Sequence, residues 1–530
     1  MTGRTRQDRA DPDAPAGAVP RAGWRARLAK ARRELGPAAR RNWLAVALLA
    51  TGLALRVLAL AAYRPALLYV DSLKYLYNAY PGSDPLGYEL PLKAILAVGN
   101  LTVVVGVQHL LGLAMAVVIY GLLRRRQVPR WLAALAIAPV LLDAYQVQIE
   151  QNIMPDVWFE ALIVAGAAAL LARPAPAARA VILAGLLLGA SATVRQVGEI
   201  LVVPGVAFLL AAAAGWQAAF QRAFEFVVAF AVPVAGYMIG SYVITGHLWL
   251  ASATPSLSSY GRMATAADCA TLRIPAYERP LCPTARERRY GIDWLDHDSR
   301  SPLKSYVAPP GMQRYAVIAN FDHQVAEQQP GRVLGAIAAD GAHLFALTRT
   351  ASQDGTPISR WQFQDSYPTF GTWVRVRPDG LIMLGLYLRP GGGPEVTRPL
   401  DPGYGGRASV IRPIAAFLRA YQLGGGYTPG PLMAVFALAG LAGSLRLVIR
   451  RPSGPRRGQA QACLLFFGCA AAVLAVSDAF QFTWRYQLPA LVTLPAAGAL
   501  GAMALMPRAA GRPATEGERE PDRPAATPAT

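Results

Sequence analysis

Cysteine, histidine and nucleotide-binding motifs are scarce in this sequence, and each shortage excludes a class of protein. Four cysteines in 530 residues are too few for a disulfide scaffold. The five histidines, among them His109, His247 and His323, show no spacing typical of a zinc site, so no metal ligands are predicted. The sequence has no Ser-His-Asp order and no nucleic-acid motif, and RPGGGP at 389–394 lacks the lysine and hydroxyl residue of a phosphate-binding loop.

Long apolar runs are what the sequence does contain. Hydrophobic residues make up 54% of the chain, with a mean hydropathy of +0.29. They fall in blocks long enough to cross a bilayer, which takes about 20 residues per helix. A net charge of +20 would also suit a nucleic-acid partner. The arginines, however, lie mainly in the tails and in short links between apolar runs, which favours a membrane protein without nucleic acid.

About ten apolar segments are predicted to be transmembrane helices. The strongly basic links follow every second segment, beginning with Arg124, Arg125 and Arg126. Basic links stay on the cytoplasmic side, so both termini are predicted to be cytoplasmic. The predicted segments are 43–62, 99–123, 131–142, 157–171, 180–194, 200–214, 223–244, 429–448, 460–476 and 487–506.

The predicted fold class is a mainly α, polytopic membrane protein with one large extracytoplasmic domain of mixed α/β character. That domain is predicted to be helical over 312–346, with a break at Pro330, and strand-like over 372–388. The domain also contains Cys269 and Cys282. These two cysteines pair as a disulfide if the domain faces an oxidising side and are otherwise two free thiols. The chain is therefore divided into five regions. A disordered cytoplasmic tail (1–42) precedes a catalytic module of about seven helices (43–245) and the extracytoplasmic domain (246–428). About three further helices (429–506) and a second disordered cytoplasmic tail (507–530) follow.

Charged residues from five separate parts of the chain gather near the outer interface under this topology. Ionisable groups are costly at membrane depth, so such a cluster is a functional-site hypothesis. Acids suit removal of a proton from an acceptor hydroxyl, and arginines suit a lipid-borne phosphate, although transporters also assemble such clusters. The residues are Arg56, Asp71, Lys74, Glu89, Glu150, Asp156, Arg195, Asp478 and Arg485.

Structural alternatives stay open for eight of these nine residues, all but Asp478. Asp71 and Asp156 could each cap the start of a helix. Arg56 could extend along its helix to the interface, and Arg195 and Arg485 could do the same or form structural pairs. Three others are typical of a solvated loop surface, namely Lys74, Glu89 and Glu150.

Five short motifs occur in a fixed order along the chain. An acid stands in the first outer loop at Val70-Asp71-Ser72, with Tyr75 after it, and a proline-glycine-tyrosine patch follows at 84–88. The second outer loop carries Ile153-Met154-Pro155-Asp156. A glycine-rich segment at 184–195 ends in Arg195, and Arg485-Tyr486 precedes Pro489. Together they resemble the GT-C superfamily of membrane glycosyltransferases, in particular the protein O-mannosyltransferase and aminoarabinose-transferase-like branches.

The resemblance implies transfer of a sugar from a polyprenyl-phosphate donor to an extracytoplasmic acceptor, which is a protein, lipid or envelope polymer, at the bacterial plasma membrane. It implies that Asp71 is the general base and that Asp156 positions the acceptor or a divalent cation. Donor or acceptor contacts are expected from Arg195, Arg485, Tyr75, Tyr88, Arg56 and Lys74. The central position of the 246–428 domain departs from the aminoarabinose branch. A transporter or flippase, or a non-catalytic glycan-binding membrane protein, is the alternative.

Overall fold

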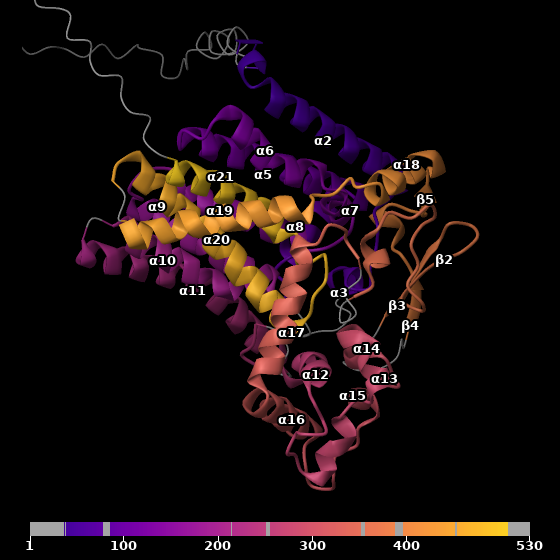
Figure 1. The fold of residues 1–530 in the computed structure, drawn as a ribbon. Coiled ribbons are helices and arrows are strands. Elements are labelled where there is room, and N and C mark those ends of the chain that lie inside the picture. Colours follow the sequence, from indigo (N-terminus) through magenta and orange to yellow (C-terminus); the bar gives the residue numbers. More distant parts are fainter. Residues whose placement is uncertain are drawn as a thin grey trace, which may run out of the picture.

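The fold was derived from a computed structural model, which describes residues 36–37, 39–77, 85–213, 215–250, 255–350, 356–386, 396–450 and 453–506. Nearly all of the predicted tail at 1–42, the whole tail at 507–530, Asp84 and the glycine run at 389–394 lie outside these residues. The described part of the chain is mainly helical (Figure 1).

Each of the ten predicted apolar segments contains a helix, and together these helices form the body of the described protein (Figure 1). Five of them, α2, α5, α11, α19 and α20, are long and apolar enough to cross a membrane. The α6 helix and α7 (Ala144–Glu150) are bent by 51° and make a sixth if they form one span, so the count of ten spans stays a prediction. The ten are α2 (Trp43–Ala62), α5 (Leu101–Arg125), α6 (Arg130–Leu142), α8 (Asp156–Leu171), α9 (Ala178–Val194), α10 (Val202–Ala212), α11 (Trp216–Thr245), α19 (Gly430–Arg450), α20 (Pro455–Phe480) and α21 (Pro489–Leu505).

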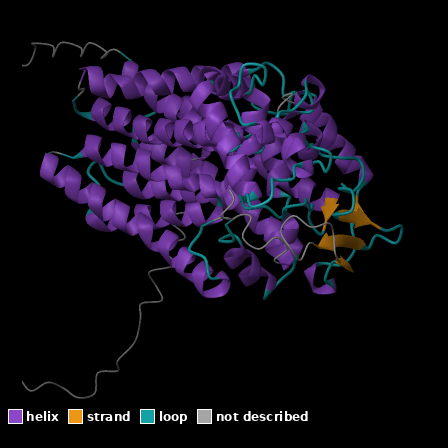
Figure 2. Cartoon of the chain, turned by 90° about the horizontal axis from the view of Figure 1, so that it is seen from below, coloured by secondary structure: helices purple, strands orange, loops and turns teal. Residues whose placement is uncertain are grey.

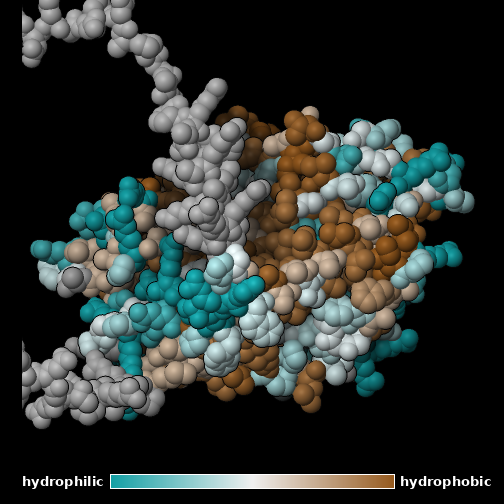
Figure 3. Space-filling view, turned by 90° about the horizontal axis from the view of Figure 1, so that it is seen from above, coloured by the Kyte–Doolittle hydropathy of each residue, from teal (hydrophilic) through white to brown (hydrophobic). Residues whose placement is uncertain are grey.

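Large apolar side chains cover the outward faces of these helices. Val57 on α2, Phe224 on α11 and Leu438 on α19 are all exposed. Figure 3 shows such hydrophobic residues spread over much of the surface seen from above. Exposed apolar areas of this extent mark a surface that contacts lipid or another protein, and on helices of spanning length they indicate lipid.

Glycines let the helices of the body approach one another closely. Gly185 and Gly189 lie four residues apart on the α9 face that packs on α11. A Cβ atom at Gly185 would lie 2.6 Å from the carbonyl oxygen of Phe226, and one at Gly189 would collide with the carbonyl oxygen of Phe230. The glycine-rich sequence before Arg195 is therefore a close-packing face of the kind common between membrane helices.

The insertion between α11 and α19 consists of two parts with different cores. Residues 255–342, here called the insertion domain, pack around Tyr260, Ile318 and Phe321, and Cys269 and Cys282 form a disulfide there. Its helices are α12 (Pro255–Ala266), η2 (Ala276–Leu281), α13 (Ala285–Arg288), α14 (Gly291–His297), α15 (Pro302–Ser305), α16 (Arg314–Gln328) and α17 (Pro330–Ala342), so the predicted helix pair is present, with its break at Gln329.

The second part, residues 343–428, does not share that core. Its apolar side chains, such as Trp361 and Leu384, join the main core of the helical body because they pack directly on it. The insertion predicted as a single domain thus packs as two parts. This part contains η3 (His343–Phe345), η4 (Ile358–Trp361), β2 (Val374–Val376), β3 (Ile382–Leu386), β4 (Val396–Pro399), η5 (Pro402–Tyr404), β5 (Ser409–Val410) and α18 (Arg412–Leu423).

Two small antiparallel sheets lie at one edge of the helical body (Figure 2). One has the order β2-β3-β4, with Val374 opposite Leu384. In the other, β1 (Tyr63–Arg64) pairs with β5 and places Tyr63 opposite Val410. The second sheet ties the chain leaving α2 to the insertion, just before the segment that carries Asp71.

Candidate functional site

Backbone hydrogen bonds join the two segments that carry the predicted acids. Leu67, in the segment after α2, donates to the carbonyl of Gln151 at 2.9 Å, and Ile153 donates to the carbonyl of Leu67 at 3.1 Å. This short parallel contact fixes the register of the two segments. As a result Asp71, just before α3 (Ser72–Tyr77), and Asp156, the first residue of α8, lie beside the same arginine.

Arg485 bridges the two acids. Its Nη1 donates to Asp71 Oδ2 at 2.6 Å, and its Nε donates to Asp156 Oδ1 and Oδ2 at 3.1 and 3.0 Å. Arg195 Nη1 also donates to Asp156 Oδ1. These four residues, here called the open cluster, come from four separate stretches of the chain, and the structure brings all four together.

Arg195 is positioned by the end of α9 and by the first outer segment. Gly87 donates its N–H to the carbonyl of Thr193 at 2.8 Å, and a side chain at Gly87 would collide with Thr193. The proline-glycine-tyrosine patch before α4 (Glu89–Leu96) therefore packs directly against the turn that carries Arg195. The Arg195 guanidinium lies over the Tyr486 ring, 4.7 Å from its centroid. Contact with an aromatic face limits the orientations of the arginine.

The open cluster keeps one acid partly accessible, and a further cation, Lys74, lies beside that acid. The Asp71 side chain is 30% exposed, and Lys74 Nζ lies 3.7 Å from its Oδ1. Burial raises the pKa of the Asp71 carboxyl, but the charges of Lys74 and Arg485 outweigh that effect and hold the pKa below its usual range. Among the described residues, three cations, Lys74, Arg195 and Arg485, face the two acids at this site.

Part of the arginine donor capacity is unused within the described residues. Arg485 Nη2 and two nitrogens of Arg195 have no hydrogen-bond partner among them. Guanidinium N–H groups bind carboxylates and phosphates in a bidentate manner. The arrangement can therefore accept an anion without first breaking the contact between Arg195 and Asp156.

Residues of the insertion complete this site, and sequence reasoning did not identify them. The Trp361 ring lies 5.5 Å from the guanidinium carbon of Arg485 and donates its indole N–H to Thr483. Arg360 donates to the Tyr69 hydroxyl at 3.0 Å and pairs with Asp293 of α14 at 3.1 Å. The Arg360-Trp361 dipeptide stands in a region without a recognisable motif, so only the tertiary fold places it here.

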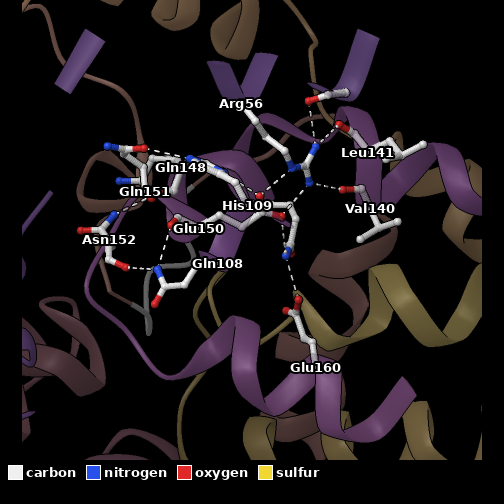
Figure 4. Close-up of polar contacts among 12 residues, drawn as sticks. Arg56, Gln108, His109, Val140, Leu141, Gln148, Glu150, Gln151, Asn152 and Glu160 are labelled. Atoms are coloured by element: carbon white, nitrogen blue, oxygen red, sulfur yellow. Dashed lines mark hydrogen bonds and ion pairs between the residues drawn. The ribbon is translucent and has the colours of Figure 1, made fainter. Parts of the chain in front are cut away.

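A second ionic group, here called the closed cluster, lies inside the helical body (Figure 4). It consists of Arg56, His109, Gln146, Glu150 and Glu160. Arg56 donates to both carboxylate oxygens of Glu150, at 2.7 and 2.6 Å, and to the carbonyls of Gly52, Val140 and Leu141 at 2.9–3.1 Å. The α6 helix ends at Leu142, so the carbonyls of Val140 and Leu141 accept no hydrogen bond within that helix. All five guanidinium N–H donors are thus used.

His109 and Gly112 on α5 complete the surroundings of Glu150. The two ring nitrogens of His109 lie 2.8 Å from Glu150 Oε2 and 2.8 Å from Gln151 Oε1. Gln151 uses its amide nitrogen for the carbonyl of Tyr63, so its amide oxygen is the atom that faces His109. A Cβ atom at Gly112 would collide with the Glu150 carboxylate, which explains glycine there.

The two clusters are connected through α8. Gln146 donates to Glu150 Oε1 at 3.3 Å and to Glu160 Oε2 at 2.7 Å. Glu160 follows Asp156 by one helical turn on α8. The helix thus begins at the open cluster and contacts the closed cluster one turn later.

Several sequence predictions need correction against these positions. Arg56 and Glu150 are 1% and 0% exposed and pair with each other inside the helical body, so Glu150 is not on a loop surface. Lys74 is also buried, beside Asp71. Tyr75 and Tyr88 are buried against each other in an edge-to-face pair, so neither ring lies on an open surface.

Two further expectations concern Asp478 and a metal ion. Asp478 does not join the open cluster: it accepts from Gln487 at 2.8 Å, and its carbonyl accepts from Arg262 of the insertion domain. Across the described ranges, no three His, Cys, Asp or Glu side chains are grouped in a way that could hold a metal ion. The two acids of the open cluster are engaged with arginines instead.

Comparison with known proteins identifies no family for the chain. No family model and no curated protein matches it. The S. cerevisiae protein O-mannosyltransferase Pmt1-Pmt2 complex bound to the sugar donor is similar at a TM-score of 0.31 and 17% identity. The similarity covers 42% of this chain and 36% of that chain, about a third of its length. A score of this size establishes no shared fold, so function has to be argued from the site.

Proposed function

We propose that this protein is a membrane glycosyltransferase that moves a sugar from a polyprenyl phosphate to an acceptor outside the cytoplasm. The observation that carries the proposal is the bridge of Arg485 between a partly exposed acid, Asp71, and a buried one, Asp156. A site with an accessible carboxylate and spare guanidinium donors, beside helices of spanning length, fits a hydroxyl acceptor and a lipid-borne phosphate.

Arg485 would be shared between Asp71 and the donor. A phosphate that draws Nη1 of Arg485 to itself weakens one of the interactions that hold the pKa of Asp71 low. The carboxylate then becomes a stronger base at the moment when the donor is in place. Asp156 keeps Arg485 and Arg195 oriented throughout, because it is buried and accepts hydrogen bonds from both.

The reaction balances with these groups alone. Asp71 removes the proton of the acceptor hydroxyl while the acceptor oxygen forms a bond to the anomeric carbon. The bond from that carbon to the phosphate oxygen breaks, and its electron pair leaves with the phosphate. Arg195 and Arg485 stabilise the negative charge that develops there. Attack opposite to the leaving phosphate inverts the anomeric centre.

The proposed location is a bacterial plasma membrane, with the open cluster outside and both termini in the cytoplasm. The basic link at Arg126 supports this orientation. Arg126 donates to the carbonyls of Leu171, at the end of α8, and Gly458, near the start of α20. These are the helix ends opposite to Asp156 and to the Arg485 segment, so the basic link and the open cluster lie at opposite ends of the same helices.

A transfer assay tests the proposal. Purified protein in lipid nanodiscs would be incubated with polyprenyl-phosphate sugars, chosen by comparing the lipid-linked sugars and envelope glycans of cells with and without the protein. Asp71→Asn is expected to lower transfer by about 10²–10⁴-fold, the usual contribution of a general base. Asp379→Asn, in the exposed turn between β2 and β3, serves as control. Retention of full transfer by Asp71→Asn contradicts the proposal.

A further inference from the structure

A hollow lies in the insertion domain, apart from the open cluster. Its volume is about 310 Å³, which lies at the lower end of the range of small-ligand sites. It opens between η2 and α16, at the end of the insertion domain that Figure 1 places farthest from the helical body. Tyr277, Met312 and Gln313 are exposed on its rim, whereas Glu278 and Val317 are buried at its floor.

Glu278 is an unusual residue for that floor. Its side chain is completely buried, and Oε1 accepts a hydrogen bond of 2.6 Å from the Asn320 amide. The other oxygen, Oε2, has no hydrogen-bond partner among the described residues. Burial raises the pKa of this carboxyl, and the Asn320 hydrogen bond offsets that only in part. A buried oxygen without a partner is costly, which favours a ligand that supplies one.

No ion pair within the described chain accounts for Glu278. The arginines that flank the hollow use their guanidinium groups on backbone carbonyls. Arg279 donates to Cys269 O at 3.0 Å, and Arg314 donates to the carbonyls of Leu303 and Tyr306. The carboxyl is therefore held without a cation, unlike those of Asp71, Asp156 and Glu150.

The segment that carries Glu278 is held rigidly. The disulfide between Cys269 and Cys282 closes on its C-terminal side. The hydroxyl of Tyr260 donates to Leu281 O at 2.6 Å, and the hydroxyl of Tyr306 donates to Tyr277 O at 3.0 Å. A binding group positioned before the ligand arrives loses less conformational entropy on binding.

We infer that this hollow binds one sugar ring of a glycan, with Tyr277 against the apolar face of the ring and Glu278, Asn320 and Gln313 on its hydroxyl groups. Planar carboxyl and amide groups beside an aromatic side chain match adjacent hydroxyls above an apolar ring face. An amine is less well matched, because a single carboxyl whose charged form is disfavoured by burial is a weak partner for a cation. The choice of a sugar rests on the proposed function, whereas the binding itself needs no transfer.

Saturation-transfer NMR on the full-length protein in lipid nanodiscs tests this inference. The probes are the methyl α-glycosides of mannose, glucose, galactose and rhamnose, with n-butylamine as the amine probe. At least one glycoside is expected to bind, and Glu278→Ala and Asn320→Ala are each expected to weaken its binding by about tenfold, as loss of one hydrogen bond would. Glu327→Ala, an exposed position on the same α16 helix, is the matched control.

The inference fails if no glycoside binds, if only the amine binds, or if the binding is unchanged in Glu278→Ala and Asn320→Ala. Tyr277→Ala and Glu278→Gln keep the test decisive if an alanine variant does not fold, since Tyr277 is on the rim and glutamine preserves volume. Asp71→Asn should keep this glycoside binding. If the wild-type protein binds a glycoside but transfers no sugar, only the glycosyltransferase proposal is contradicted. If it transfers sugar but does not bind a glycoside in this way, only this inference is contradicted.

Discussion

The open and closed clusters both pair arginine with carboxylates and meet on the same helix, α8, yet their arginines differ in how completely their N–H donors are used. In the closed cluster every N–H donor of Arg56 has an acceptor, and neither Arg56 nor Glu150 is more than 1% exposed. In the open cluster Asp71 is 30% exposed and both arginines keep unused donors within the described chain. A complete ion pair holds helices together, whereas an incomplete one can bind a ligand.

The largest effect is expected in the closed cluster. Arg56→Met removes all five hydrogen bonds and leaves Glu150 buried without its main partner. Loss of one member of a buried pair costs about 3–5 kcal/mol of unfolding free energy. Denaturant unfolding in detergent micelles measures this loss. Arg375→Met, on the exposed face of β2, should change stability by less than about 0.5 kcal/mol. Equal effects at the two positions would show that the closed cluster is not structural.

The matching change in the open cluster should act on activity more than on stability. Arg485→Lys keeps the charge but loses the geometry that reaches Asp71 and Asp156 together. Transfer should fall by about 10²–10³-fold, as when one donor to a developing negative charge is removed. The assay is the rate of sugar transfer, with unfolding measured in parallel. Full transfer by Arg485→Lys would mean that the bridge has no part in the reaction.

Gly112 tests how tightly the closed cluster is enclosed. Gly112→Ala places a methyl group against the Glu150 carboxylate and 2.8 Å from Arg56 Nη2, so stability should fall by about 1–3 kcal/mol. Gly106 lies on the same α5 helix, and an added Cβ there meets nothing within 4 Å. Gly106→Ala should therefore be neutral or stabilising, since alanine favours a helix. Unfolding of the two variants side by side measures the difference, and similar stabilities would contradict the tight enclosure.

The smallest effect concerns the pH dependence of transfer. Lys74 and Arg485 lower the pKa of Asp71, so its carboxylate stays ionised from neutral pH down into the acid range. Lys74→Met removes one of these charges and raises that pKa. The acid limb of the kcat/KM profile should therefore move to higher pH, with little change near neutrality. Lys304→Met, in the insertion domain, should leave the profile in place. If the acid limb of the Lys74→Met profile is not shifted, Lys74 does not influence the pKa of Asp71.

The positions of the helices in the helical body could largely be predicted from the apolar runs of the sequence. Each of the ten predicted segments contains a helix, and the bounds 43–62 match α2, because a long apolar run leaves the chain few alternatives. The split of the insertion was not predictable in this way. Whether Trp361 joins the core of the helical body or that of the insertion domain depends on tertiary contacts that no local pattern encodes.

The four residues of the open cluster were also identified from order and spacing along the chain. Arg56 was assigned to the same cluster because its helix depth matched that of Asp71. The structure instead pairs it with Glu150, 94 residues away, through a kink between α6 and α7 that exposes two carbonyls. The position of a residue along a predicted span indicates which end of the span it lies near. It does not indicate on which face of the helix the side chain lies or which residue it pairs with.

The central claim is that Arg485 is shared between Asp71 and the donor. The affinity of the purified protein for a polyprenyl phosphate is its most direct test. Asp71→Asn should bind this lipid more tightly than the wild type because it releases Arg485, although its rate of sugar transfer is strongly lowered. Arg485→Lys should bind it more weakly. Equal affinities in the wild type and both variants would contradict the account.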